Sequence, residues 1–188
     1  MTDTDVQTDL HADLQALTRT HREAHGCGAH TYSDGAALTA LVAKLRPQRI
    51  LELGTGLGYT ACCMASGYKF ARIDTIEGDP THVTLAREQI QLRGMTGRIT
   101  VHPGMFATEL PRLGGIYELV FFDGYTPDRP TILMLRDRLR TGGTLVCANL
   151  DLAAGSGAME LMSELSDPYY WRREGALESG DTLILTKV

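Results

Sequence analysis

A short glycine-rich turn holds the residues whose spacing points most directly to ligand chemistry. It contains Gly54, Gly56 and Gly58, follows an apolar run, and enters a helical segment. Glycines in such a turn permit positive φ and let a ligand approach the backbone. The dinucleotide fingerprint G-x-G-x-x-G/A would need a small residue at position 59, which is Tyr59, and the acidic Glu52 lies two residues before the first glycine. The turn therefore argues against a pyrophosphate and suits a ligand with a cationic amino group.

A second acid, Glu77, follows about twenty residues after the turn, at the end of the next apolar run. A carboxylate at this position can accept hydrogen bonds from the two ribose hydroxyls of a nucleoside. A nucleoside joined to an amino acid would satisfy both Glu52 and Glu77.

These residues require an alternation of strands and helices to position them, and the apolar pattern supplies it. Strands are predicted at 50–53, 73–76, 99–102, 119–122, 144–149, 169–173 and 182–187, and helices at 58–66, 80–93, 128–139 and 158–165. The helix at 80–93 is predicted to have Asp79 as its N-cap, Pro80 at its first position and Gly94 directly after it. Two further helices precede these elements, one with Val6, Leu10, Leu14 and Leu17 at helical spacing and one with Ser33 as its predicted N-cap. The pattern predicts an α/β fold, a doubly wound, mostly parallel seven-stranded sheet with helices on both faces and an antiparallel last strand pair. Ligands of such sheets bind outside the carboxyl ends of the strands.

Residues 50–60 together with Glu77 resemble the cofactor motifs of class I S-adenosylmethionine-dependent methyltransferases. The resemblance extends from about Ser33 onward. Within that class the chain is similar to the catechol and caffeoyl-CoA type O-methyltransferases, on the motifs Ser33-Asp34-Gly35, Glu52-Leu53-Gly54, Gly58-Tyr59-Thr60, Phe122-Asp123-Gly124, Gly142-Gly143 and Asn149.

The resemblance implies S-adenosylmethionine as cofactor and S-adenosylhomocysteine as product, and it assigns a role to each part of the site. The methionine moiety would lie against Glu52 and the turn, with the Tyr59 amide and the Thr60 hydroxyl near its carboxylate, and Glu77 would hold the ribose. The implied cofactor residues are Glu52, Gly54, Thr55, Gly56, Gly58, Tyr59, Thr60, Glu77, Gly78, Gly104, Met105, Phe106, Asp123 and Tyr125. Gly104, Met105 and Phe106 would contact adenine, and Asp123 and Tyr125 would lie beside the sulfonium and the acceptor.

The chain departs from the family at the metal site and at the base. The family holds a divalent cation with one Asp after the fourth strand and an Asp-Asn pair after the fifth, and it uses a nearby Lys. Here Asp123 and Asn149 remain, but Ala148 and Thr126 stand at the other two positions. We therefore expect no metal ligands, with Asp151, two residues past Asn149, as the one candidate substitute. We expect Asp123 or His30 to act as the base.

Composition limits the remaining possibilities. The chain has 188 residues and a formal net charge of -5, so we expect one domain, no nucleic-acid partner and a small-molecule acceptor. No apolar run approaches the roughly 20 residues of a membrane span. The four cysteines lack CxxC spacing, which is typical of a reducing cytoplasm, with Cys62 and Cys63 as core residues. His21 and His25 have i,i+4 spacing and are interpreted as a solvated helix end.

Taken together, the sequence predicts a cytoplasmic, metal-independent or weakly metal-dependent O-methyltransferase. Residues 1–32 would form a helical lid or dimerisation segment and 33–188 the catalytic domain, with an acceptor pocket built partly from the last strand pair near Tyr169, Tyr170 and Trp171. We expect a homodimer. Two alternatives stay open: a catalytically silent module that binds the same cofactor, and a nicotinamide-dependent oxidoreductase, which Glu52 and Tyr59 disfavour.

Overall fold

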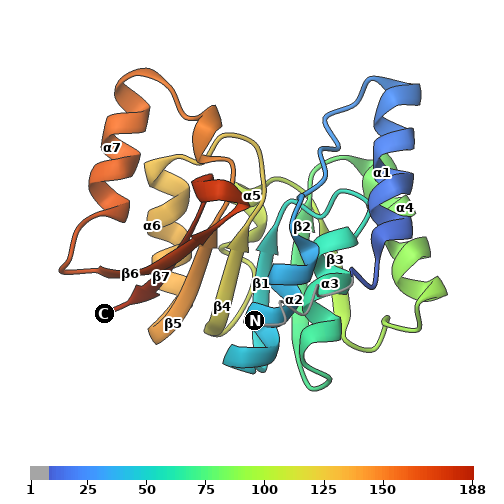
Figure 1. Cartoon of the computed structure of the whole chain (residues 1–188), viewed down its shortest axis with the longest axis horizontal. Coiled ribbons are helices and arrows are strands. Elements are labelled where there is room, and N and C mark those ends of the chain that lie inside the picture. The colour runs from blue at the N-terminus through green and yellow to red at the C-terminus, as the bar shows by residue number, and fades with distance from the viewer. Residues whose placement is uncertain (1–8) are drawn as a thin grey trace, which may run out of the picture.

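The computed structural model describes residues 9–188, which form one mixed sheet with helices on both faces (Figure 1). The strands are β1 (Arg49–Leu53), β2 (Arg72–Glu77), β3 (Ile99–Pro103), β4 (Tyr117–Phe122), β5 (Leu139–Cys147), β6 (Trp171–Leu177) and β7 (Thr182–Lys187). The helices are α1 (Ala12–His25), α2 (Gly35–Leu45), α3 (Tyr59–Gly67), α4 (Pro80–Leu92), α5 (Phe106–Glu109), α6 (Arg129–Arg138) and α7 (Gly155–Leu165), with 3-10 turns η1 (Leu150–Leu152) and η2 (Glu178–Gly180).

The strand order β3-β2-β1-β4-β5-β7-β6 confirms the predicted seven-stranded sheet. The strands β1 to β5 are parallel to one another, and β7 is antiparallel to both β5 and β6. The order of strands along the sheet changes direction at β1: β2 and β3 lie on one side of it, and β4 and the later strands lie on the other. Doubly wound sheets bind ligands beside such a switch point, outside the carboxyl ends of the strands.

Alternating side chains of the buried strands build two separate cores. Ile50, Ile73 and Phe121 face one side, where they pack with α1, α2, α3 and α4, whereas Leu51 and Phe122 face α6 and α7. This period of two, with both faces covered, explains why the strands read as continuous apolar runs. Cys62 and Cys63 are buried in the first core, as predicted.

An Asp side chain caps the start of each of the helices α2, α4 and α6. Asp79 accepts hydrogen bonds from the amides of Thr81 and His82 and precedes Pro80, as the sequence predicted. The prediction for α2 was wrong by one residue: Asp34 caps it by accepting from the Ala37 amide, while the Ser33 hydroxyl donates to Glu178. A carboxylate partner distant in sequence thus draws Ser33 away from the helix.

The predicted helical segment at the N-terminus lies only partly within the described residues. Val6 lies outside them, and α1 begins at Ala12. Leu14 is fully buried against α3, while Leu10 is 65% and Leu17 is 41% exposed. Within the described part of the chain, no helix combines the length and apolar character needed to cross a membrane.

Candidate active site

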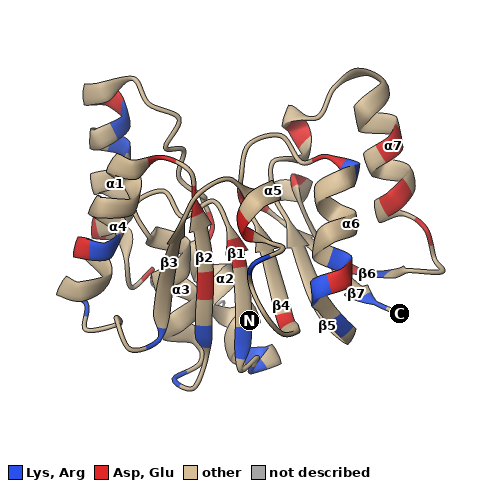
Figure 2. Ribbon diagram, turned by 180° about the vertical axis from the view of Figure 1, so that it is seen from behind, with Lys and Arg blue, Asp and Glu red and all other residues tan. Residues whose placement is uncertain are grey.

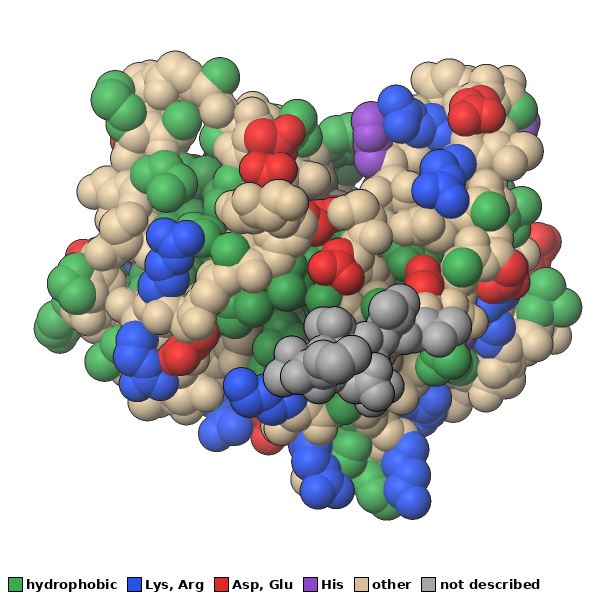
Figure 3. All heavy atoms as spheres, viewed as in Figure 1, with side chains coloured by type: hydrophobic (Ala, Val, Ile, Leu, Met, Phe, Trp, Pro, Cys, Tyr) green, Lys and Arg blue, Asp and Glu red, His purple; other side chains and the backbone are tan. Residues whose placement is uncertain are grey.

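A cavity of about 780 Å³ opens at the carboxyl edge of the sheet. Figure 3 shows it as a hollow between the shoulder formed by α1 and α4 and the shoulder formed by α7. Its wall comes from the glycine turn, the segments after β2, β3, β4 and β5, and the loop that joins α1 to α2. The cavity therefore lies at the switch point where the sequence placed the ligand.

Charge is distributed unequally between the two ends of the central strands. Arg49 and Arg72 begin β1 and β2, whereas Glu52 lies near the end of β1 and Glu77 ends β2. In Figure 2, blue marks the starts of β1 and β2, and red lies farther along both strands, toward the cavity edge. The field at the cavity is therefore suited to a cationic group.

The glycine turn has the backbone conformation that only glycine adopts easily. Gly54 has φ +92, and a Cβ built on it would overlap the carbonyl oxygen of Asp123. Gly56 has φ +52 and faces open space. Gly54 thus allows the turn to pass directly beside the end of β4, which brings Asp123 to the same wall.

Glu77 is fixed at the wall of the cavity by the turn itself. Its Oε2 accepts hydrogen bonds from the amides of Thr55 (3.1 Å) and Gly56 (2.8 Å), and its Oε1 accepts from the Asp79 amide (2.9 Å). A carboxylate has about four acceptor sites, so capacity remains for a ligand hydroxyl. The sequence prediction of an acid presented beside the glycine turn agrees with this geometry.

Glu52 is fully buried and does not reach the cavity wall directly. Its Oε1 accepts a hydrogen bond from the Thr60 hydroxyl at 2.5 Å, and Thr60 lines the cavity. Its Oε2 has no hydrogen-bond partner among the described residues. Burial raises the pKa of Glu52 to about 7, despite the hydrogen bond from Thr60.

Asp123 follows β4 and lines the cavity beside Asn149. Its pKa lies well above the usual range, because it is desolvated and faces the negative charges of Glu52 and Glu178. The Asn149 side-chain amide opposes this shift by donating to Asp123 Oδ1 at 3.3 Å. Glu52 and Asp123 thus both resist ionisation, and a cation in the cavity would stabilise both as anions.

The turn after β3 forms another part of the wall. The Gly104 amide donates to the Glu77 carbonyl at 2.8 Å, which joins this turn to the end of β2. Phe106 packs edge-on against Phe122 with ring centroids 6.2 Å apart, and Met105 is 68% exposed. Gly104, Met105 and Phe106 thus lie together on the cavity wall, where an apolar ring system could be held.

The loop between α1 and α2 covers the remaining side of the cavity. His30 is exposed and lies on the wall, and a Cβ at Gly28 would overlap the hydroxyl of Tyr125. Tyr125, in the segment after β4, therefore lies against this loop. The predicted acid-base candidates Asp123 and His30 share one cavity.

Most of the predicted cofactor residues line this cavity, and two do not. Residues on the wall are Gly54, Thr55, Gly56, Tyr59, Thr60, Glu77, Gly78, Gly104, Met105, Phe106, Asp123 and Tyr125. Glu52 lies behind Thr60, and Gly58 instead faces Ala86 and Ile90 of α4. The role of all fourteen residues in ligand binding stays a prediction.

Sequence reasoning missed several wall residues, most notably His82, Leu57 and Thr18. The sequence predicted the start of this helix at Asp79 and Pro80, but not that His82, three residues after Asp79, would lie on the cavity wall. The predicted contribution of Tyr169, Tyr170 and Trp171 to the acceptor pocket was wrong. The order β5-β7-β6 makes β6 run in the same direction as β5, so its first residue, Trp171, lies at the opposite edge of the sheet.

Together, this strand order and an acid-lined cavity at the switch point define a doubly wound fold of the class I methyltransferase type. A family profile described as "Methyltransferase domain" matches residues 51–150, just over half of the chain. The chain therefore belongs to this methyltransferase domain family.

Relatives support the same placement, and a solved structure shows the same fold. The chain is 31% identical over 132 residues to a catechol O-methyltransferase of Sus scrofa, covering 65% of this chain and 70% of that protein. It is 31% identical over 122 residues to a catechol O-methyltransferase of Niastella koreensis, covering 62% of this chain and 55% of that protein. The matches thus span just over half the length of the first curated relatives. An O-methyltransferase from Bacillus cereus, solved in complex with SAH, superposes with a TM-score of 0.78 at 20% identity, covering 99% of this chain and 94% of that one.

The residues at the family's metal position do not fit a magnesium site of the catechol type. Ala148 is fully buried and offers no ligand oxygen, and the Asn149 amide group donates to both Asp123 and the Gly124 carbonyl. Among the residues at this position, Asp123 is then the single carboxylate. Hard cations such as Mg²⁺ favour several clustered oxygen ligands.

Proposed function

We propose that the protein is an S-adenosylmethionine-dependent O-methyltransferase that acts on a small molecule. The observation that carries this proposal is the cavity in which Glu77, fixed by the glycine turn, faces the same space as Asp123. Glu77 supplies an acceptor for ribose hydroxyls, and the carboxyl pair Glu52 and Asp123 supplies negative charge for the cationic part of the cofactor. The names of the catechol O-methyltransferase relatives support transfer to oxygen.

Methyl transfer from a sulfonium is an in-line displacement. The acceptor hydroxyl gives its proton to a base, its oxygen bonds to the methyl carbon, and the sulfur leaves with the electron pair of the broken carbon-sulfur bond. The protein has to align the acceptor, accept the proton and exclude water. Asp123 and His30, which share the cavity wall, are the candidate bases.

We infer a reaction that needs no divalent cation at Asp123, or depends on one only weakly. Ala148 and Asn149 supply no second carboxylate there, and Asp151, although on the cavity wall, lies in the exposed 3-10 turn η1. Turnover should persist after treatment with EDTA, and added Mg²⁺ should change it less than twofold, roughly the scale of a nonspecific salt effect. Loss of turnover in EDTA that Mg²⁺ restores would contradict metal independence.

The silent binding module is a second candidate function. Thr126 stands where the family has a Lys, so the chain lacks a residue with which its relatives assist deprotonation. A module of this kind would bind S-adenosylhomocysteine but transfer no methyl group to any acceptor. It differs from an enzyme only in turnover, so binding measurements alone do not separate the two.

Two measurements test these functions together. Thermal shift with S-adenosylhomocysteine should stabilise the protein and NAD should not; a ligand at 100 times its Kd adds roughly 2.7 kcal/mol of stability. Mass spectrometry should then detect addition of a methyl group to a member of a panel of catechols, phenols and carboxylic acids. Stabilisation by NAD alone would refute the proposal, and cofactor binding without any product would favour the silent module.

His30 and Asp123 can be separated by substitution within the same assay. His30→Ala should lower kcat by about 10²–10⁴-fold if the imidazole accepts the acceptor proton, with little change in the Kd for S-adenosylhomocysteine. Full turnover of His30→Ala would leave Asp123 as the base. His25→Ala is a matched control, since His25 is also exposed but lies on α1 outside the cavity wall.

We further propose a cytoplasmic homodimer without nucleic-acid partners, in which residues 1–32 act as lid and dimerisation segment beside the domain 33–188. The exposed Leu10 and Leu17 support a contact through α1, although the buried Leu14 does not contribute to it. Light scattering should give the mass of a dimer, and Leu10→Asp with Leu17→Asp should convert it to a monomer. A wild-type monomer at micromolar concentration would refute this contact.

A further inference from the structure

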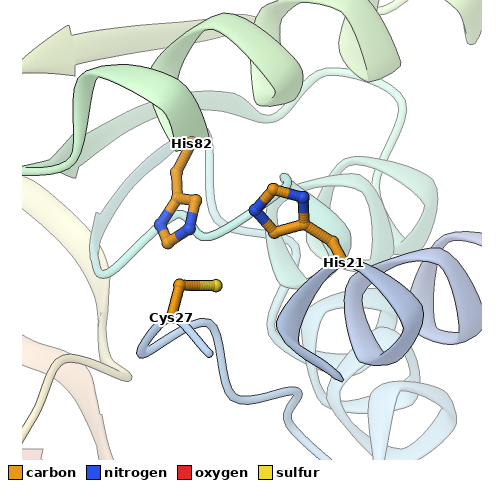
Figure 4. A group of neighbouring side chains, drawn as sticks. All are labelled: His21, Cys27 and His82. Carbon is orange, nitrogen blue, oxygen red and sulfur yellow. The ribbon is translucent and has the colours of Figure 1, made fainter. Parts of the chain in front are cut away.

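Three metal-ligating side chains from separate segments meet beside the cavity, outside the residues used above. His21 lies on α1, Cys27 in the loop after it, and His82 near the start of α4. One nitrogen of each histidine and the Cys27 sulfur all lie within 4.8 Å of one another. Figure 4 shows the two imidazole rings turned toward each other, with the sulfur of Cys27 beneath them. The sequence spacing of His21 and His25 gave no indication of this group.

The three side chains are available as ligands. Their side chains form no hydrogen bonds with one another or with other residues in the described range 9–188, although Glu77 Oε1 lies 3.8 Å from His82 Nδ1. His82 is buried, and His21 and Cys27 are half-buried. A neutral imidazole is the form that binds a metal.

The chemistry of the group restricts which ions it can take. Imidazole nitrogen and thiolate sulfur are both zinc ligands, with bonds of about 2.0–2.3 Å in a tetrahedral arrangement. Two imidazoles with one thiolate also occur in blue-copper sites, which add a weak axial ligand such as Met. Ligand atoms around a zinc ion are about 3.3–3.8 Å apart by tetrahedral geometry, so the present group needs only small side-chain rotations. Magnesium and calcium prefer oxygen ligands and are disfavoured here.

We propose that His21, Cys27 and His82 bind one Zn²⁺ ion, with a water molecule in the fourth position. The Cys27 thiol loses its proton to solvent as the zinc-sulfur bond forms, so binding releases protons. The ion connects the end of α1 to the start of α4, two segments that are otherwise joined here by the contact between the His21 and His82 rings, whose centroids lie 5.4 Å apart.

The position of the ion gives it a consequence for the cavity. His82 lies on the cavity wall three residues after Asp79, and Glu77 is its neighbour. A zinc ion on His82 would hold this part of the wall and the loop containing Gly28 in one arrangement. If the proposed function holds, zinc should also slow the dissociation of S-adenosylhomocysteine, but zinc binding itself does not depend on that function.

The test uses full-length protein from which any affinity tag has been removed, treated with a chelator and then titrated with ZnCl₂ in competition with a chromophoric chelator. We expect one ion per chain. Co²⁺ in place of Zn²⁺ should give a thiolate-to-cobalt charge-transfer band together with the intense visible bands of a tetrahedral site. MgCl₂ should neither compete nor bind.

Single substitutions assign the ligands. Cys27→Ser, His21→Asn and His82→Asn should each weaken zinc binding at least about tenfold, since even outer-shell changes cost 10–100-fold, and Cys27→Ser should abolish the charge-transfer band. His25→Asn is the matched control, because His25 stacks on His21 at 4.4 Å yet lies outside the group. Circular dichroism and the urea midpoint of each variant confirm that it is folded.

Several results would overturn the proposal. Substoichiometric binding, a cobalt complex without the charge-transfer band, or equal losses in Cys27→Ser and His25→Asn would each exclude the site. Because Cys27 and His21 are only half-buried, their variants keep the test valid even if His82→Asn fails to fold.

Discussion

Replacing Glu52 by Gln should make the stability of the ligand-free protein less dependent on pH. Glu52 is fully buried, and its pKa is raised to about 7 by burial. Gln has the same shape and can accept the hydrogen bond from the Thr60 hydroxyl, but it cannot ionise. The substitution therefore removes the buried charge while it keeps the packing and this contact.

The sign and the size of the effect follow from linkage. A carboxyl whose pKa is higher in the folded state binds more protons there than in the unfolded chain, so its ionisation lowers the free energy of unfolding as pH rises. The pKa of Glu52 rises from 4.5 to about 7, which at 1.36 kcal/mol per pH unit corresponds to about 3 kcal/mol. About 2.5 kcal/mol of this falls between pH 5 and 8, and no further loss from Glu52 follows well above pH 7.

The assay is urea unfolding of the wild type and Glu52→Gln at several pH values from 5 to 8. The buried Gln amide group adds a pH-independent cost of roughly 1–3 kcal/mol. The test is therefore how the difference in free energy of unfolding between wild type and Glu52→Gln changes with pH. Glu88→Gln, an exposed residue of α4, is the control for loss of one negative charge and should shift stability by about 0.5 kcal/mol or less. A difference between Glu52→Gln and wild type that stays constant from pH 5 to 8 would refute burial as the cause.

Three further predictions concern the turn and its ligand. Gly56→Ala should lower the free energy of unfolding by about 1–2 kcal/mol, because alanine is strained in the left-handed backbone conformation of this residue. Gly54→Ala should lower it by a further ~1–3 kcal/mol, because its Cβ would also overlap the Asp123 carbonyl. Equal losses of stability in thermal melts of the two variants would contradict this. Glu77→Gln should raise the Kd for S-adenosylhomocysteine roughly 10–100-fold by calorimetry, since hydrogen bonds to a charged group contribute about 1.5–3 kcal/mol; an unchanged Kd would exclude Glu77 from ribose binding. S-adenosylmethionine, whose sulfonium is cationic, should release protons on binding because it lowers the raised pKa values of Glu52 and Asp123. Its affinity should therefore increase as pH rises toward 7, by up to about tenfold per pH unit for each proton released, and more steeply than that of S-adenosylhomocysteine. Calorimetry in two buffers of different ionisation enthalpy measures this release.

The fold could be predicted from the sequence because its signals are local. Strand periodicity, Asp79 followed by Pro80, and Gly94 after the helix each fix an element from neighbouring residues. The errors occurred where a distant partner decides the outcome. Ser33 is drawn to Glu178, and β5 begins at Leu139, five residues earlier than predicted, because Tyr117 of β4 pairs with it there.

The proximity of the predicted cofactor residues could be predicted for a related reason. In a parallel sheet, the carboxyl ends of strands meet at one edge, so Gly54, Glu77 and Asp123 had to come close once their strands were assigned. The burial of Glu52 behind Thr60 depends on which face of β1 it occupies, and it shares the face of Ile50, two residues before it. This alternation was readable in the sequence, and it places the Glu52 side chain in the core behind Thr60 rather than on the cavity wall.

Residues that would contact the acceptor depend on loops, and loops carry no such periodic signal. Tyr125 is 73% exposed, yet its hydroxyl lies against Gly28, a residue 97 positions earlier in the chain. That contact requires the absence of a Cβ at Gly28, so the shape of the pocket depends on a pairing that neither segment encodes alone. With Trp171 at the opposite edge of the sheet, we expect acceptor selection to arise from this contact, His30 and the segment around Asp151. We therefore expect the loop between α1 and α2 to form part of the acceptor site, so that a change in the packing of α1 on α3 alters which acceptors fit.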